Sequence, residues 1–139
     1  MMKLILFFIF FTTTIFAQSI EGKWKTIDTK TQTELSIIEI YKKNNQYYGK
    51  LIKILNVLSS HADCEKCSMK IKNNSLIGKD VIVKMVKDDK QYKGKLIDPF
   101  SDKSYNCTIN IITNSSLEIN AYSILPIFGR TQNWIKHSE

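Results

Sequence analysis

The sequence lacks the short motifs by which many enzyme active sites can be recognised. It contains no G-x-S-x-G, no H-E-x-x-H and no glycine-rich phosphate loop. Only two histidines are present, and one of them, His137, lies so close to the C-terminus that fraying is expected there. Because catalysis requires an acid, a base or a nucleophile within mutual reach, the sequence favours a protein without enzymatic activity.

The sequence also has no hydrophobic run long enough to span a membrane. Its most apolar stretch, from Leu4 to Phe16, is shorter than the roughly 20 residues that a spanning helix needs. Lys3 precedes this stretch and the small residue Ala17 ends it, which is typical of a cleaved signal peptide. We therefore expect residues 1–17 to be removed during export, leaving residues 18–139 as one periplasmic or extracellular domain without a transmembrane anchor. No cysteine follows the cleavage point, which argues against a lipid-anchored protein.

Elements that recognise nucleic acid are absent as well. The formal net charge is +7, but the lysines are scattered along the chain, and no helix with a basic stripe or known nucleic-acid motif is found. We therefore exclude nucleic acid as a partner. Scattered lysines are typical of a solvated surface, and they also allow a weak attraction to anionic envelope polymers or membrane surfaces.

One stretch occurs twice and organises the rest of the chain. Lys42 to Ile52 reads KKNNQYYGKLI, and Lys87 to Ile97 reads KDDKQYKGKLI. Each copy follows an apolar run, SIIEIY before the first and VIVKMV before the second. The Asn and Asp residues after these runs favour tight turns, so each unit predicts a β-hairpin.

The remaining chain alternates apolar and polar residues in short runs. The clearest case is Ser104 to Thr113, where Tyr105 and Cys107 share one face. The predicted strands cover residues 20–28, 34–43, 46–56, 79–87, 90–97, 104–113, 117–121 and 128–136. Eight short meandering strands lose their exposed edges by closing, so we predict an all-β, single-domain antiparallel barrel of about eight strands. A half-open barrel and a two-sheet sandwich are the alternatives.

These residues resemble a family of exported bacterial proteins, the domain-of-unknown-function family twenty-one forty-seven, and the G-x-W opening is similar to that of lipocalin-like barrels. The matching motifs, in chain order, are Gly22-x-Trp24, Tyr48-Gly49-Lys50-Leu51, Cys64-x-x-Cys67, Ile77-Gly78, Gly94-x-Leu96-Ile97-Asp98-Pro99, Tyr105-x-Cys107 and Gly129-Arg130-Thr131-Gln132-x-Trp134. The resemblance implies a lipocalin-like barrel in the bacterial envelope and no established activity. The sequence departs from the family at residues 100–103, which replace the usual glycine-containing turn.

Closure of such a barrel predicts a contact between its first and last strands. We expect the guanidinium group of Arg130 to lie on the indole ring of Trp24, as a clamp to which Trp134 also contributes. The alternative is that Arg130 points into the barrel and pairs with an acidic ligand.

Three cysteines allow two kinds of cross-link. In an exported chain, Cys64 or Cys67 of the long segment 57–76 is expected to form a disulfide with Cys107, and a Cys64–Cys67 bridge is the other pairing. His61 together with the three cysteines is alternatively a set of four zinc ligands, although a single C-x-x-C is a weak zinc signal. Free thiols are the third alternative.

Tyrosines supply the candidate ligand contacts. Inward-facing Tyr47, Tyr92 and Tyr105 would give an apolar wall with polar tips, to which Arg130 would add a charge. An eight-stranded barrel is just wide enough to hold one small ligand or to be filled by its own side chains. We therefore expect an exported protein that binds a small apolar or amphipathic ligand. The alternatives are an envelope interaction module that acts through segment 57–76 and a metal-dependent enzyme.

Overall fold

The computed structural model describes residues 17–56, 75–99, 101–124 and 129–138. Eight strands follow one another in these ranges. They are β1 (Gly22–Ile27), β2 (Glu34–Lys43), β3 (Gln46–Ile54), β4 (Asp80–Asp88), β5 (Gln91–Ile97), β6 (Ser104–Thr113), β7 (Ser116–Tyr122) and β8 (Arg130–Lys136). Within these ranges no helix is both long and apolar enough to cross a bilayer.

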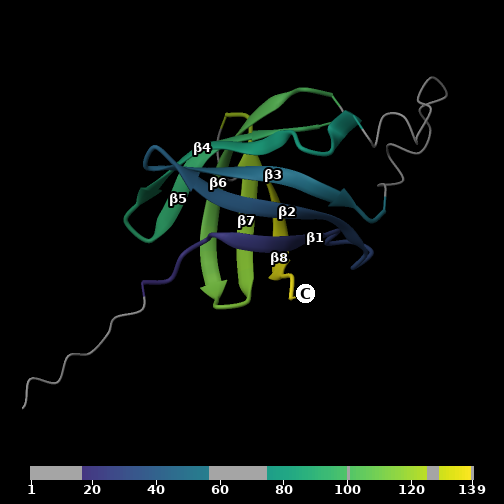
Figure 1. Cartoon of the computed structure of the whole chain (residues 1–139), viewed down its shortest axis with the longest axis horizontal. Coiled ribbons are helices and arrows are strands. Elements are labelled where there is room, and N and C mark those ends of the chain that lie inside the picture. Colours follow the sequence, from purple (N-terminus) through teal and green to yellow (C-terminus); the bar gives the residue numbers. More distant parts are fainter. Residues whose placement is uncertain (1–16, 57–74, 100, 125–128, 139) are drawn as a thin grey trace, which may run out of the picture.

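The strands form a closed antiparallel barrel in which each strand pairs with its neighbours in sequence (Figure 1). The barrel is closed by β1 and β8, which pair at Trp24 with Lys136, Lys25 with Ile135 and Thr26 with Trp134. Strands β6 and β7 cross β1 to β3 at a steep angle in Figure 1, as expected for the tilted strands of a small barrel. The predicted all-β barrel is therefore confirmed, and the half-open and sandwich alternatives are excluded.

The two ends of the barrel differ in their connections. At one end, called the hairpin end, three tight turns join β2 to β3, β4 to β5 and β6 to β7, and β1 begins and β8 ends there. At the other end, called the loop end, the longer connections lie. In the first hairpin, Asn44 and Asn45 both have positive φ angles, of 52° and 61°, which gives the strand-matching twist of a type I′ turn.

Two turns at the loop end share one geometry. The amide of Asp28 donates to the carbonyl oxygen of Thr33 at 2.9 Å, and the amide of Asp98 donates to that of Lys103 at 2.8 Å. The residue that needs a left-handed backbone is Gln32 in the first turn and Asp102 in the second, with φ angles of 57° and 58°. Asp tolerates this conformation, so Asp102 takes the left-handed position without the glycine that the family resemblance leads one to expect.

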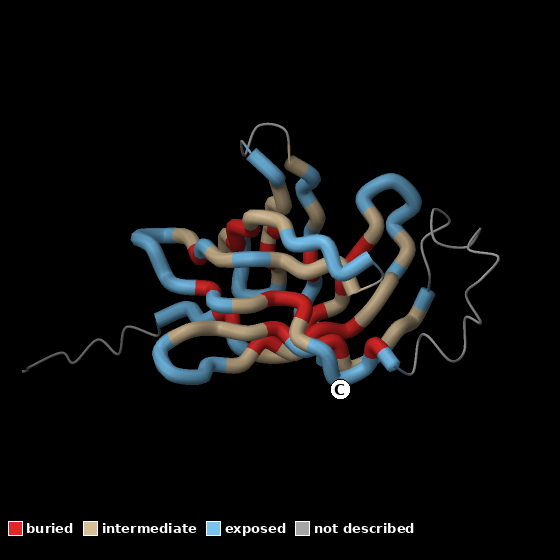
Figure 2. Tube along the Cα trace, turned by 90° about the horizontal axis from the view of Figure 1, so that it is seen from above, coloured by how far each residue is buried: buried red, intermediate tan, exposed pale blue. Residues whose placement is uncertain are grey.

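The barrel interior is filled by large side chains from the hairpin end to its middle. Buried segments of the chain converge in the centre of the molecule, whereas the turns are exposed (Figure 2). The largest fully buried side chains are Trp24, Trp134, Tyr92, Ile20, Ile40, Ile82, Met85, Ile109, Leu117, Ile119 and Cys107. Toward the loop end, the inward residues Leu96 and Tyr105 are only half-buried.

Both glycines of the repeated hairpin lie beside β4, and the interior is tightest there. A Cβ atom at Gly49 would lie 2.9 Å from Cβ and Cγ1 of Ile82. A Cβ atom at Gly94 would collide with Met85. Lys84, with a φ angle of 53°, forms a bulge between them that allows both Ile82 and Met85 to point inward. The two repeats therefore each provide one glycine, and the absence of a side chain there lets the residues of β4 pack against the backbone.

We expect Gly49→Ala to lower the free energy of unfolding by about 1–3 kcal/mol, because the new methyl group overpacks the interior against Ile82. Urea unfolding of the purified protein measures this. In the double variant with Ile82→Ala, the loss should be smaller than the sum of the two single losses. Lys43→Ala, an exposed change at the end of β2, serves as the control. A Gly49→Ala protein as stable as the wild type would contradict the packing described above.

Candidate functional site

Trp24 and Lys136 lie directly opposite each other where the barrel closes. The Trp24 indole is buried, and its Nε1 donates to the carbonyl oxygen of Ile20 at 2.9 Å. The Lys136 ammonium lies 4.8 Å from the ring centroid and donates to the carbonyl oxygen of Glu21 at 3.3 Å. Gly22 makes room for this side chain, because a Cβ atom there would lie 2.8 Å from Lys136 Nζ. Lys136 therefore covers the Trp24 ring at the hairpin end of the barrel.

The predicted contact between Trp24 and Arg130 is wrong. Arg130 is the first residue of β8 and pairs with Ala121 at the loop end, whereas Trp24 pairs with Lys136, the last residue of that strand. The stagger between neighbouring strands of a tilted barrel sets this register, and alternation within one strand does not reveal it. Trp134 does belong to the closure: it is buried opposite Thr26, and its Nε1 donates to Gln132 Oε1 at 2.7 Å.

The repeated hairpins place two more lysines over inward rings. Lys42 Nζ lies 5.6 Å from the ring centroid of Tyr47, and Lys87 Nζ lies 6.0 Å from that of Tyr92. The two tyrosines meet edge to face, with centroids 5.2 Å apart. Each lysine is the direct cross-strand partner of its tyrosine. Three lysines, including Lys136, therefore hold their charges over aromatic rings at the hairpin end.

The four residues predicted to bind a ligand do not come together. Tyr47 and Tyr92 belong to the packed hairpin end, and Tyr92 is only 2% exposed. Tyr105 lies near the loop end of β6, half-buried and opposite Leu96. Arg130 is exposed at the loop-end start of β8. The structure therefore separates the predicted set into two pairs at opposite ends of the barrel.

Cys107 is a free, buried thiol, so the predicted disulfide between it and Cys64 or Cys67 is not formed in the structure. Its strand partners are Gly94 and Ala121, and burial raises the pKa of the thiol to about 12. Cys64, Cys67 and His61 lie outside the described residues, where the Cys64–Cys67 bridge and the zinc set stay predictions. Within the described ranges, no three His, Cys, Asp or Glu side chains gather in a way that could hold a metal ion.

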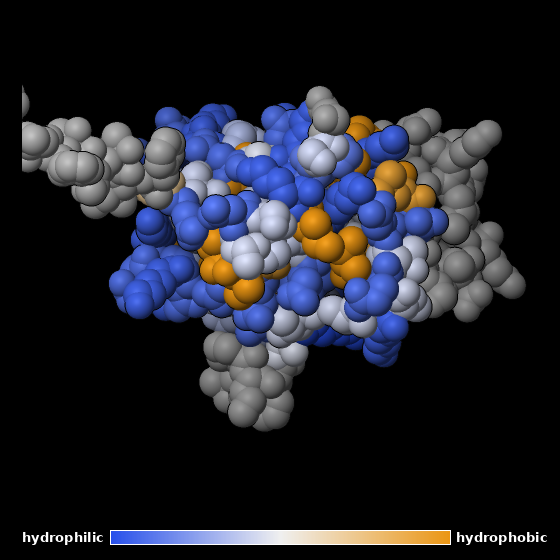
Figure 3. All heavy atoms as spheres, turned by 90° about the horizontal axis from the view of Figure 1, so that it is seen from below, coloured by the Kyte–Doolittle hydropathy of each residue, from blue (hydrophilic) through white to orange (hydrophobic). Residues whose placement is uncertain are grey.

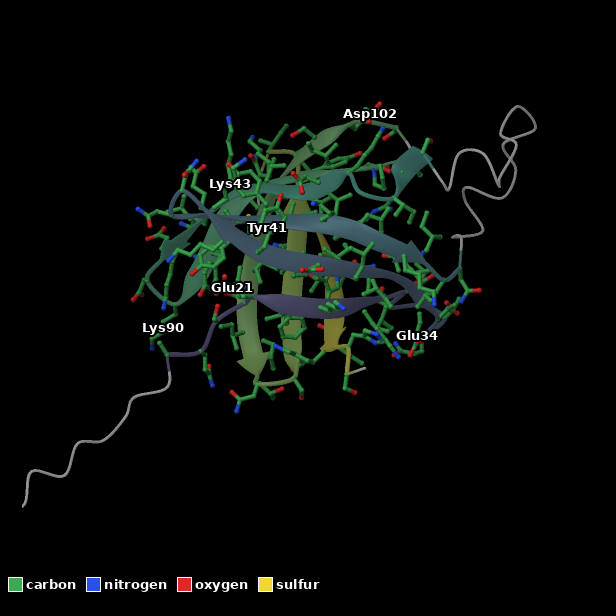
Figure 4. The ribbon with its side chains drawn as sticks, viewed as in Figure 1. Glu21, Glu34, Tyr41, Lys43, Lys90 and Asp102 are labelled. Carbon is green, nitrogen blue, oxygen red and sulfur yellow. The ribbon has the colours of Figure 1, made fainter. Side chains whose placement is uncertain are left out.

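A groove of about 370 Å³ lies on the outer face of the barrel, and we call it the outer groove. Its lining residues are Lys23, Lys25, Glu34, Ile37, Ile52, Lys53, Leu55 and His137. Lys23 and Lys25 alternate with the inward Trp24, which places the groove outside the barrel wall. Figure 4 shows Glu34 at the loop end of β2, beside this groove.

The outer groove combines an apolar floor with a basic rim. Ile37 faces outward and is nevertheless only 5% exposed. Lys25 pairs with Glu34 at 3.0 Å, and Lys53 forms no ion pair with any described residue. His137 continues the pairing of β8, since its amide donates to the carbonyl oxygen of Lys23 at 2.9 Å. Its Nδ1 atom is buried without a hydrogen-bond partner among the described residues. The groove lining therefore contains three lysines, one histidine and one carboxylate, and that carboxylate already pairs with Lys25.

The sequence reasoning missed this groove, although one signal for it was present. Ile37 and Ile38 are adjacent, so one of them must face outward from a strand with one buried face. Ile52 next to Leu51 gives the same signal on β3. On the face shown in Figure 3, hydrophobic residues form separate small patches among hydrophilic ones. Outward-facing apolar residues are therefore local features rather than one broad apolar surface in that view.

A second outer cluster lies nearer the hairpin end, where Figure 4 labels Tyr41. The Tyr41 and Tyr48 rings stack with centroids 5.9 Å apart, and Lys50 Nζ lies 5.4 Å from the Tyr41 centroid. The Tyr41 hydroxyl donates to Asp80, at 2.9 Å from Oδ1 and 3.1 Å from Oδ2. Partial burial, followed by the hydrogen bond to Asp80 and its negative charge, raises the pKa of Tyr41 to about 12. This cluster ties β2, β3 and β4 together across their outer face.

Comparison with known proteins identifies the family. Residues 22–136 match the family described as "Uncharacterized protein conserved in bacteria (DUF2147)". The chain belongs to this family. It is similar to a solved Helicobacter pylori structure described as "Protein HP1028 from the human pathogen Helicobacter pylori belongs to the lipocalin family". The two are 20% identical over 88% of this chain and 86% of that chain, with a TM-score of 0.62. No curated protein matched the sequence. The DUF2147 resemblance and the lipocalin-like barrel predicted from the sequence are therefore confirmed.

We expect Lys136→Met to lower the free energy of unfolding by about 0.5–1 kcal/mol, because the ammonium–indole attraction is lost while an apolar stem remains. Lys136→Arg should keep most of the stability. Arg130→Met, an exposed change at the other end of β8, should alter stability by less than about 0.5 kcal/mol. Chemical unfolding of the three variants measures their free energies of unfolding. If Arg130→Met lost more stability than Lys136→Met, the contact of Trp24 with Arg130 expected from the sequence would be favoured instead.

In an alkaline titration, Tyr41 should ionise near pH 12, well above the ordinary value of 10.0. Because the pKa is raised in the folded protein, the neutral hydroxyl stabilises the fold below pH 10, and this contribution is lost as the pH rises through about 12. The ultraviolet absorbance of tyrosinate measures the transition. Tyr41→Phe should remove it, and Asp80→Asn should move it to lower pH. An unchanged titration in Asp80→Asn would contradict the role of the carboxylate.

Proposed function

We propose that this DUF2147 protein binds a small amphipathic ligand with an anionic head group, and that the outer groove is the binding site. The observation that carries this proposal is the composition of the groove. Three lysines and an unpartnered imidazole nitrogen surround a floor formed by Ile37, Ile52 and Leu55. The ligand is still the amphipathic one expected from the sequence, but its site lies on the outer face and not inside the barrel.

The chemistry of the outer groove suits such a ligand at both of its ends. A carboxylate or phosphate would form a charge-assisted hydrogen bond with the Lys53 ammonium group, and such a bond is stronger than one between neutral groups. An alkyl chain would cover the isoleucine and leucine side chains of the floor, which favours binding by removing apolar surface from water. The groove volume of about 370 Å³ lies within the range of small-molecule sites.

The packed interior supports the choice of the outer face over the barrel centre. A ligand in the centre would have to displace Trp24, Tyr92 or Met85, each of which is at most 2% exposed. Opening such a core costs the packing energy that holds the barrel together. The lipocalin-like architecture supports ligand binding in general, whereas the location of the site is inferred from the outer groove of this chain. Export to the envelope remains part of the proposal, and the interaction role of segment 57–76 stays a prediction.

Decanoate is a suitable probe, and Lys53→Glu is the variant that tests the site. Reversing a charge at the groove rim should weaken decanoate binding about tenfold or more, because attraction to the carboxylate becomes repulsion. Isothermal titration calorimetry measures the affinity, and amide NMR shifts on addition of decanoate locate it. The shifts should centre on Ile37, Ile52 and His137.

Lys103→Glu is the matched control, because it reverses a charge in an exposed loop-end turn outside the groove lining. It should bind decanoate as the wild type does, and the neutral decyl glucoside should bind the wild type more weakly than decanoate. Equal binding by Lys53→Glu and the wild type would reject the groove. Shifts centred on Leu96 and Tyr105 would instead return the ligand to the barrel mouth.

A further inference from the structure

The hairpin end of the barrel carries an excess of positive charge. The turns of the two repeated hairpins bring Lys42 and Lys43 from the first unit and Lys87 and Lys90 from the second, and Lys136 completes the set at the end of β8. We call these five residues the lysine rim. Figure 4 places the labelled Lys43, Lys90 and Glu21 on the same side of the molecule.

Acidic neighbours balance only part of this charge. In the described part of the chain, the carboxylates near the rim are Glu21, Asp88 and Asp89. Asp88 is already paired with Lys93 at 2.8 Å, which leaves two carboxylates beside five lysines. At the loop end, the described residues include four basic side chains and four aspartates: Lys30, Lys79, Lys103 and Arg130, with Asp28, Asp80, Asp98 and Asp102. The charge is therefore distributed unevenly along the barrel.

Three of the rim lysines are held in place by the barrel itself. Lys42, Lys87 and Lys136 extend over the rings of Tyr47, Tyr92 and Trp24, with ammonium-to-centroid distances of 4.8–6.0 Å. A long lysine side chain normally loses conformational entropy when it binds an anion. The ring contacts already restrict these side chains in the folded barrel, so less conformational entropy is lost on binding. The ammonium groups are therefore pre-organised for an anionic surface.

From these observations we propose that the lysine rim docks the barrel onto an anionic phospholipid bilayer. Several ammonium groups spread over one end of a rigid body match a plane of phosphate charges better than they match one small anion. All five rim lysines are exposed, so their ammonium groups can reach such a plane of charges together.

Vesicle co-sedimentation tests this docking with the purified protein. Vesicles that contain phosphatidylglycerol should pellet the wild type at low ionic strength, and vesicles of phosphatidylcholine alone should not. Replacing Lys42, Lys87 and Lys136 by Gln should weaken binding about a hundredfold, since each lysine near an anionic membrane contributes roughly a fivefold gain. Added salt should release the wild type, because it screens the attraction.

Two further variants make the result decisive. Gln at the exposed loop-end positions Lys30, Lys79 and Lys103 removes the same charge elsewhere and should leave binding close to that of the wild type. Arg at Lys42, Lys87 and Lys136 keeps the charge and the ring contacts, so it should bind normally even if the Gln variant unfolds. Equal losses in the two Gln variants, equal binding to both kinds of vesicle, or no binding by the wild type would each overturn the proposal.

Discussion

The whole architecture depends on the pairing of β1 with β8, which joins the two ends of the folded chain through three residue pairs. Without it, the other seven strand pairings would form an open, curled sheet with two exposed edges. The chemistry at this seam reflects its importance. Trp24 and Trp134 are both buried there, and Lys136 covers the Trp24 ring from the solvent side. Pairing the two ends of a chain costs loop-closure entropy, and the burial of two tryptophan rings at the seam offsets part of that cost.

The repeated hairpin explains why the barrel is filled from its hairpin end to its middle. Each copy contributes a tyrosine that enters the interior and a glycine that leaves space for β4. Ile82 and Met85 occupy that space and bring β4 close to both neighbouring strands. The small radius of an eight-stranded barrel leaves little volume once these side chains and the two tryptophans are inside. The repeated sequence therefore supplies the same packing residues twice, and each copy also carries a lysine that lies over its tyrosine ring.

The fold could be predicted from local signals, whereas most of the site could not. Alternation in Ser104–Thr113 and the Asn-rich and Asp-rich turns are properties of a few consecutive residues, and they specify strands and hairpins directly. The contact of Trp24 with Lys136 depends on the sum of the register shifts between neighbouring strands around the barrel, which cannot be read from the sequence of any one strand. The outer groove depends on Ile37 being outward yet covered, a combination that requires knowledge of neighbouring strands. The cysteine pairing rests on residues far apart in sequence, of which only Cys107 is described.

The buried side chains in the centre of this lipocalin-like barrel leave no room for a ligand there. Under the proposed function the ligand binds on the outside of the barrel wall, and that requires apolar residues at positions that alternation assigns to solvent. β2 and β3 meet this requirement at Ile37 and Ile52, each beside an inward residue of similar size. The lysine rim arises differently, because three of its five ammonium groups lie over aromatic rings that also pack in the core. One set of aromatic side chains can therefore seal the interior and orient the cations on its surface.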